Sequence, residues 1–236
     1  MAKSQSHSDF RNVILSCLSS EHLEGIRPHL RPIELAIRQV IYEPNQPIEH
    51  VYFVETGMIS VVSVMADGRS IEVGTIGSEG VAGGVLLLGS KAVPYQYFVQ
   101  MAGSGFRVDA AAFEDIAKRN EDFRDLLLRY HSAFHTQTMQ TAACNGLHSI
   151  SQRCCRWLLM SQDRINGDTV PLTQEFLGTM LGVRRASVSD VLRPIQERGW
   201  IRSNRGEITI LDRKGLESGS CECYSVIAEQ QKKLLN

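Results

Sequence analysis

The polar side chains between residues 184 and 193 have the types and the spacing that recognition of a nucleic acid needs. The segment RRASVSDVLR interleaves arginine and serine with apolar positions. A guanidinium group can bind O6 and N7 of guanine through two hydrogen bonds, and serine hydroxyls can bind bases or phosphates. We therefore expect Arg184, Arg185, Ser187, Ser189 and Arg193 to contact DNA, with Arg185 reading guanine.

Two short helices around a glycine turn would position these side chains. Thr173 can cap the first helix, and Gly182 stands where a left-handed residue would end it. A second apolar stripe then begins at Val183. This order is typical of a helix-turn-helix whose second helix, at about residues 184–193, enters the DNA major groove. A pair of ordinary core helices is the alternative interpretation.

A predicted β-hairpin follows the second helix. Ile208 and Ile210 alternate with polar residues, and the Asn-Arg-Gly sequence at residues 204–206 suits a tight turn. A helix-turn-helix followed by a hairpin is a winged helix, in which Arg202 and Arg205 could reach phosphates; a solvated turn is the alternative. The predicted DNA-binding residues are Thr173, Arg184, Arg185, Ser187, Ser189, Arg193, Arg202 and Arg205.

Composition and charge place the chain among soluble globular proteins. It has 236 residues, of which 43% are hydrophobic and 22% charged. No apolar run is long enough to span a membrane, and the N-terminus lacks the apolar core of a signal peptide. We therefore expect a cytoplasmic protein without a membrane partner. Residues 147–214 carry 11 Lys and Arg against 7 Asp and Glu, whereas residues 1–146 carry 12 against 16. The positive charge thus lies around the helix-turn-helix, as DNA binding requires.

Cysteine, histidine and acidic residues form no recognisable catalytic or metal-binding motif. The six cysteines include no CxxC pair, and the spacings of Cys154-Cys155 and Cys221-x-Cys223 are not those of usual zinc sites. We therefore expect neither a metal site nor an enzyme. Cys221 and Cys223 stand in a segment that we expect to be an exposed tail, where they are candidate redox-responsive thiols.

The N-terminal half has the pattern of a β-rich domain. A short helix is expected within residues 10–30, and several strand-like runs follow it. Turns at residues 55–57 and 66–69 would separate three of these strands, and the Asp67-Gly68 pair is a strong hairpin signal. Short strands at close spacing indicate a β-sandwich or a jelly-roll barrel.

Helices follow the strands. One is expected over residues 110–120 and a longer one from about residue 121 to residue 146, with a seam that repeats at spacings of four and three. That seam predicts a parallel, two-fold dimer, with packing against the chain's own β-domain as the alternative. The predicted dimerisation residues are Phe123, Leu127, Tyr130, Phe134, Gln137 and Thr141. A capping box from Ser149 to Gln152 would open the next helix, which places a hinge at residues 146–149.

The elements, in this order, resemble the CRP/FNR family of bacterial transcription regulators over roughly residues 25–216. The matching motifs are LTQEFLGTMLGVRRASVSDVLRPIQERGWI and IYEPNQPIEHVYFVETGMISV. The resemblance implies an α+β chain with three parts. A sensory β-roll (a jelly roll like the cyclic-nucleotide-binding domain) occupies residues 1–120. A dimerisation helix with a hinge spans residues 121–148, and a winged helix-turn-helix domain with a C-terminal tail spans residues 149–236. It also implies a homodimer, double-stranded DNA as ligand, and RNA polymerase as a further partner.

The recognition helix departs from the family pattern. The resemblance places Arg185, Ser187 and Ser189 at the family's base-reading positions. Ala186, however, stands where the best-known members have a glutamate, so only apolar contact is available there. Asp190 replaces a frequent arginine, and we expect it to face solvent or to orient Arg193. A proline at position 194 should bend or end the helix.

The segment that matches the family's nucleotide pocket departs further. Residues 79–100, EGVAGGVLLLGSKAVPYQYFVQ, keep a Gly-Gly pair but lack the glutamate and the Arg-Ser or Arg-Thr pair of that pocket. No arginine lies between Arg69 and Arg107, and Lys91 sits in a predicted loop. A buried cyclic phosphate needs a charged partner. We therefore expect no cyclic AMP, no cofactor and an unidentified effector. A cyclic-nucleotide-binding module without DNA binding is the alternative function.

Overall fold

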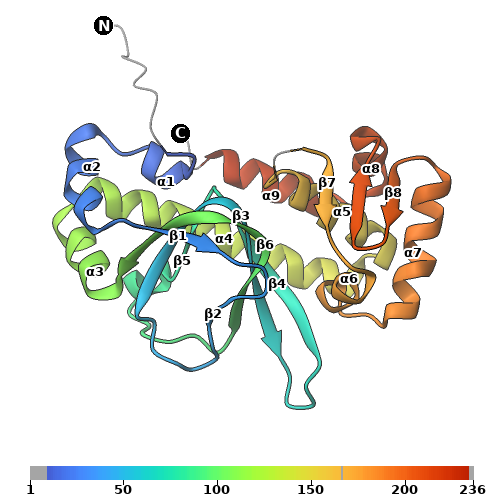
Figure 1. Cartoon of the computed structure of the whole chain (residues 1–236), viewed down its shortest axis with the longest axis horizontal. Coiled ribbons are helices and arrows are strands. Elements are labelled where there is room, and N and C mark those ends of the chain that lie inside the picture. Colours follow the sequence, from blue (N-terminus) through green and yellow to red (C-terminus); the bar gives the residue numbers. More distant parts are fainter. Residues whose placement is uncertain (1–9, 166, 234–236) are drawn as a thin grey trace, which may run out of the picture.

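The computed structural model describes residues 10–165 and 167–233 of the chain (Figure 1). A β-rich half lies beside a helical half, and one long helix, α4, runs from the first to the second. The elements of the β-rich half are α1 (Val13–Ser16), α2 (Ser20–Ile26), β1 (Arg31–Leu35), β2 (Val40–Tyr42), β3 (His50–Val64), β4 (Ser70–Ile76), β5 (Val81–Ala82), η2 (Gly84–Leu88), β6 (Gln96–Asp109) and α3 (Ala110–Arg119). Those that follow are α4 (Glu121–Leu147), α5 (Ile150–Gln162), β7 (Thr169–Pro171), α6 (Gln174–Leu181), α7 (Arg185–Glu197), β8 (Ile201–Asn204), β9 (Glu207–Ile210), α8 (Arg213–Gly219) and α9 (Cys223–Lys232).

The β-roll is an antiparallel sheet in the order β1-β6-β3-β4, with β2 paired to β6 and β5 paired to β3. The prediction of a turn at residues 55–57 is wrong. Strand β3 continues through these residues, and its pairing with β6 shifts register there. Gly57 has φ +85°, and a Cβ there would lie 2.5 Å from the carbonyl oxygen of Met101. The turn-like residues therefore form a bulge, which keeps the strand paired while bending it.

Two other local predictions had different outcomes. The hairpin at Asp67-Gly68 is confirmed: Met65 N–H donates to the Arg69 carbonyl at 2.8 Å, and Gly68 has φ +81°. The short helix expected within residues 10–30 is two helices, α1 and α2. Asn12 caps the first and Ser19 caps the second, so each cap starts its own helix.

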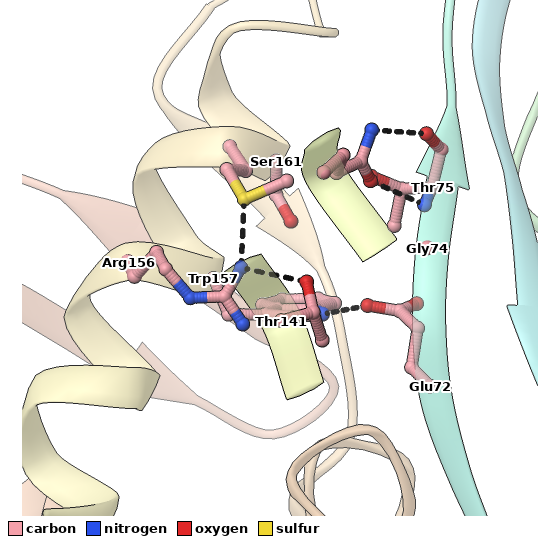
Figure 2. Close-up of a pocket in the computed structure, with 9 residues that line it drawn as sticks. Glu72, Gly74, Thr75, Thr141, Arg156, Trp157 and Ser161 are labelled. Atoms are coloured by element: carbon pink, nitrogen blue, oxygen red, sulfur yellow. Dashed lines mark hydrogen bonds between the residues drawn. The ribbon is translucent and has the colours of Figure 1, made fainter. Parts of the chain in front are cut away.

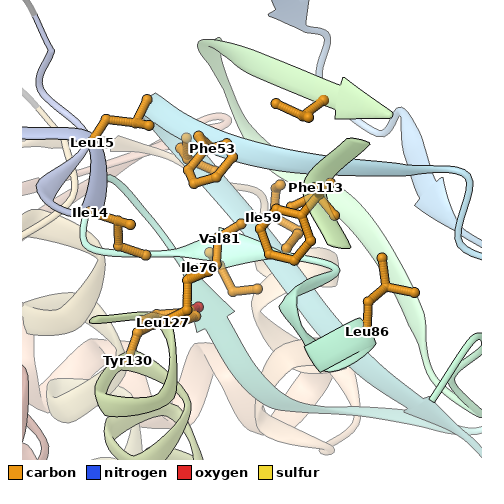
Figure 3. Close-up of a cluster of buried hydrophobic side chains, with 14 of the residues drawn as sticks. Ile14, Leu15, Phe53, Ile59, Ile76, Val81, Leu86, Phe113, Leu127 and Tyr130 are labelled. Carbon is orange, nitrogen blue, oxygen red and sulfur yellow. The ribbon is translucent and has the colours of Figure 1, made fainter. Parts of the chain in front are cut away.

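The core of the β-roll is closed by helices as well as by strands (Figure 3). Phe53 on β3 packs between Phe113 of α3 and Phe123 of α4, with ring centroids 6.3 and 6.4 Å away. All three rings are fully buried. Burial of that size ties α3 and the first half of α4 to the sheet, since each large aromatic side chain contributes about 1.5–3 kcal/mol.

The seam predicted for dimerisation packs instead inside its own subunit. Phe123, Leu127, Tyr130, Gln137 and Thr141 are buried against the described chain, and Phe134 is half-buried. The Gln137 side chain accepts a hydrogen bond from the Thr75 backbone N–H at 2.7 Å and donates one to the Thr75 carbonyl at 3.1 Å. The sheet thus satisfies the polar part of the seam and covers most of its apolar part, so the five buried residues have little surface left for a second subunit.

The helical half has a second core, which it shares with the β-roll. Trp157 and Leu158 of α5 pack with the buried faces of α6 and α7, and with Met58 and Val62 from β3. The expected capping box is present, with Ser149 and Gln152 bonded reciprocally, and it starts α5 directly after α4. The helix α7 runs to Glu197 with Pro194 inside it, so the proline does not end the helix.

The C-terminal segment is not an exposed tail. It folds into α8 and α9, and α9 lies along α4. Cys221 is 6% exposed and Cys223 is fully buried, and burial raises the pKa of Cys221 to about 12. The expectation that Cys221 and Cys223 lie in an exposed tail is therefore wrong. Readily oxidised thiols are accessible to solvent and have lowered pKa values, and these two thiols are buried.

Candidate nucleic-acid interface

The turn between α6 and α7 has the geometry that the sequence predicts. The Thr173 side chain accepts a hydrogen bond from the Phe176 N–H at 3.2 Å and so caps α6. Gly182 ends α6 with φ +64°, in the left-handed region. A Cβ at Gly182 would lie 2.7 Å from Cδ1 of Ile71 on β4. Glycine suits the backbone angle, and a side chain there would also have to displace the end of Ile71.

Helix α7 separates its apolar and polar faces cleanly. Val188, Leu192 and Ile195 are buried beneath it. Arg184 and Arg185 are exposed at its first turn, and neither has an ion-pair partner among the residues that the structure describes. Two guanidinium groups at the start of an exposed helix are therefore free to bind an external anion or a base edge. Figure 1 places α7 at the end of the molecule remote from the β-roll.

Two of the other predicted residues of α7, Ser189 and Arg193, have side-chain partners within the domain. Ser189 is exposed and its hydroxyl bonds to Oε1 of Gln174 on α6 at 2.9 Å, while Ser187 is half-buried. Asp190 pairs with Arg193 at 3.1 Å, which is the orienting role expected for it. Gln174 is not among the residues that the sequence predicts, because an amide at the first helical position gives no signal until the two helices are placed.

The wing is a three-stranded sheet in the order β7-β9-β8, of which the sequence predicted only β8 and β9. Arg202 and Arg205 are exposed, and Gly206 has φ +84° in the turn between the strands. The Leu172 N–H donates to the Gly206 carbonyl at 2.8 Å. This bond holds the wing tip next to Thr173, at the start of α6.

A second candidate site lies between the β-roll and α4. It is a cavity of about 450 Å³ with a mostly apolar lining of valine, tyrosine and phenylalanine side chains, together with His131 and His135. Burial lowers the pKa of His131, so its imidazole is neutral at pH 7. No lysine or arginine lines the cavity within the described part of the chain. Lys91, the one candidate cation, pairs with Glu114 on α3.

The β-roll and the helix-turn-helix are joined by buried polar contacts (Figure 2). The Trp157 Nε1–H donates to Oε1 of Glu72 on β4 at 2.7 Å, and Arg164 pairs with Glu79 at 2.7 Å. Burial raises the pKa of Glu72 to about 7. The space around Glu72 is only about 10 Å³, room for about one water molecule. This region is therefore a joint between two parts and not a ligand pocket.

Comparison with known families agrees with both halves of this architecture. The cyclic nucleotide-binding domain family matches residues 32–120, and the Crp-like helix-turn-helix domain family matches residues 152–218. A β-roll, a long helix and a winged helix-turn-helix in one chain define a class of transcription regulator with a DNA-binding domain. The chain belongs to the CRP/FNR family of transcriptional regulators.

Solved structures share this fold. A putative transcriptional regulator of the CRP/FNR family from Eubacterium rectale is 19% identical with a TM-score of 0.68, over 85% of this chain and 94% of that one. FixK2 from Bradyrhizobium japonicum is 19% identical with a TM-score of 0.70, over 81% and 98%. A CRP-family regulator from Thermus thermophilus is 21% identical with a TM-score of 0.67, over 80% and 96%. Among curated proteins, none matches the chain. Of the described helices, none is long and apolar enough to cross a membrane.

Proposed function

We propose that this regulator binds DNA as a homodimer and reads a near-palindromic site with two copies of α7. The exposed pair Arg184 and Arg185, at the first turn of a helix whose opposite face is buried, carries the proposal. The N-terminal residues of a recognition helix are those that approach base edges. Arg185 reads guanine through O6 and N7. Thr173, Arg202 and Arg205 hold the domain in register on phosphates.

The dimer contact in this proposal is the exposed face of α4. Because the predicted seam is buried, the face left for a second copy is the opposite one. Its exposed residues recur at spacings of four and three: Leu128, Ser132, His135, Met139, Ala142 and Gly146. Leu128 is 40% and Met139 is 61% exposed, and both stand in this regularly spaced stripe, as a helix seam that meets a second copy requires. Small residues near the end of the stripe let two helices approach closely.

Pairing along α4 sets the distance between the two recognition helices. A two-fold dimer of this kind reads half-sites about 34 Å apart, one turn of the duplex. The two arginine pairs then face successive major grooves on the same side of the DNA. RNA polymerase is a further partner that only the family membership supports.

We further propose that cyclic AMP and cyclic GMP do not control this protein. Among the residues that the structure describes, the cavity between the β-roll and α4 is lined by valine, tyrosine and phenylalanine side chains and by no cation for a phosphate. A buried anion without a charged or multiply donating partner costs several kcal/mol. An uncharged, mainly apolar small molecule fits this lining better, and the effector stays unidentified.

Selection of bound fragments from random genomic DNA by the purified protein, followed by sequencing, tests the function. The expected result is a near-palindromic consensus whose binding weakens steeply with salt. Absence of salt-dependent DNA binding, combined with a thermal shift by cyclic AMP, would support the cyclic-nucleotide-binding module instead. Sedimentation at several concentrations tests the dimer independently of DNA.

A further inference from the structure

Four metal-ligating side chains from two distant segments meet where α9 crosses the end of α4. Cys144 lies on the last turns of α4, and His148 is the residue that ends this helix. Cys221 and Cys223 flank the start of α9. One donor atom from each of the four lies within 4.8 Å of the other three. The sequence spacing argued against a metal here, because the four residues come together only in the fold.

The separations between donors suit a single tetrahedral ion. The Sγ atoms of Cys144 and Cys221 are 3.5 Å apart, and Sγ of Cys223 is 3.4 Å from Nδ1 of His148. Zinc–sulfur bonds of about 2.3 Å in a tetrahedron place two sulfur atoms about 3.8 Å apart. The four donors need only small shifts to reach that geometry, whereas a disulfide requires a sulfur–sulfur distance of about 2.0 Å.

The residues around the four donors support ligation. Nε2 of His148 lies 3.3 Å from a carboxylate oxygen of Glu222. This contact places the ring proton on Nε2 and leaves the Nδ1 lone pair directed at the thiols, as in carboxylate–histidine–zinc arrangements. The Gln140 side-chain N–H donates to Sγ of Cys223 at 3.2 Å. A donor aimed at sulfur stabilises a thiolate.

Charge gives a second, independent argument. Arg153 and Arg156 of α5 are buried, and neither forms an ion pair with a carboxylate among the described residues. The Arg156 charge acts on Cys144, and Arg153 interacts with both Cys144 and Cys221. Buried cations need a compensating anion. A zinc ion with three thiolates and a neutral imidazole carries one negative charge, which would offset one of these two positive charges.

We propose that Cys144, His148, Cys221 and Cys223 bind one structural zinc ion. Binding replaces three thiol protons, which pass to solvent, by three zinc–sulfur bonds, and the fourth bond comes from Nδ1 of His148. The ion ties the end of α4 to the start of α9. It therefore holds the C-terminal helices against the predicted dimer helix beside the junction with α5.

Elemental analysis of the full-length protein, purified without chelator, tests the proposal. We expect one zinc per chain. After removal of zinc, titration with Co²⁺ should give thiolate-to-cobalt charge-transfer absorption and the intense d–d bands of a tetrahedral site. Metal-free protein whose buried thiols stay reduced and do not take up Co²⁺ would overturn the proposal. So would iron with inorganic sulfide, or a Cys144–Cys221 disulfide found by mass spectrometry.

Variants locate the site. Cys144→Ser and Cys221→Ser should lose the bound zinc, whereas Cys17→Ser and Cys154→Ser, outside the cluster, should keep it. Glu222→Gln retains all four ligands and should weaken zinc binding by about 10–100-fold, the effect of losing an outer-shell partner. Because Glu222→Gln keeps all four ligands, its zinc affinity tests the site even if the serine variants do not fold. Unchanged zinc affinity in Glu222→Gln, together with full zinc content in Cys221→Ser, would place the metal elsewhere.

Discussion

The indole N–H of Trp157 donates a 2.7 Å hydrogen bond to a carboxylate oxygen of Glu72, and this bond joins α5 to the β-roll. The Glu72 carboxyl is buried and also accepts a hydrogen bond from Ser60. Burial raises its pKa to about 7, against the lowering effects of these bonds and of the Arg156 and Arg164 charges. The contact between the β-roll and the DNA-binding domain therefore contains a group that titrates near neutral pH.

The stability of the folded chain should fall as pH rises from about 5 to about 8. The folded state binds the Glu72 proton more tightly than the unfolded state, so its contribution is complete below the unfolded pKa of 4.5 and is lost as pH passes about 7. The full change is about 3 kcal/mol. Glu72→Gln should flatten the dependence in urea unfolding at several pH values. Glu197→Gln, an exposed control, should follow the wild type; parallel profiles for all three proteins would contradict the assignment.

Arg185→Ala should weaken binding to the selected site by about 1–3 kcal/mol and relax the preference at one base pair. Its guanidinium is exposed at the first turn of α7 and is free of ion pairs within the described chain. Arg202→Ala, on the wing, should instead weaken binding to selected and random duplexes alike and reduce the salt dependence. Titrations of both variants against both duplexes distinguish the roles. An equal loss on both duplexes for Arg185→Ala would rule out base reading.

Met139→Glu should weaken dimerisation. The Met139 side chain is 61% exposed on the face of α4 that we assign to the contact with the second subunit. A glutamate there would bring two negative charges, one from each copy, together in a buried contact. We expect dimerisation to weaken on the order of tenfold or more by sedimentation. Gln137→Ala, on the opposite face, should lower the free energy of unfolding and leave the dimer intact. If Gln137→Ala dissociates the dimer and Met139→Glu does not, the subunit contact uses the other face.

Gly182→Ala should destabilise the chain more than Gly68→Ala. Both glycines are left-handed, with φ +64° and +81°, so alanine costs about 1 kcal/mol of backbone strain at each. At Gly68 no atom of the described residues lies within 4 Å of the added Cβ, whereas at Gly182 it meets Ile71 at 2.7 Å. The difference between their unfolding free energies measures how tightly α6 packs on β4. Equal losses of unfolding free energy in the two variants would mean that α6 moves away from β4 at little cost.

Local signals account for the parts that the sequence predicts well. Thr173 and Gly182 start and end α6, and Ser149 opens α5. Each of these acts through hydrogen bonds between residues a few positions apart, so the residue types alone specify them. The Glu55–Gly57 turn shows the limit of such signals. The same residues fit a turn or a bulge, and pairing with β6 selects the bulge.

The sequence by itself determined the order of the three parts (the β-roll, the long helix and the winged helix-turn-helix) and the arginine-bearing face of α7, because these depend on residues close together in the chain. Only the tertiary structure decided which face of α4 is covered and that Cys144 meets Cys221, 77 residues away. An apolar stripe indicates that one face of a helix is buried, but it does not indicate which surface covers that face. The sheet supplies that surface, and the return of α9 along α4 brings the distant thiols together.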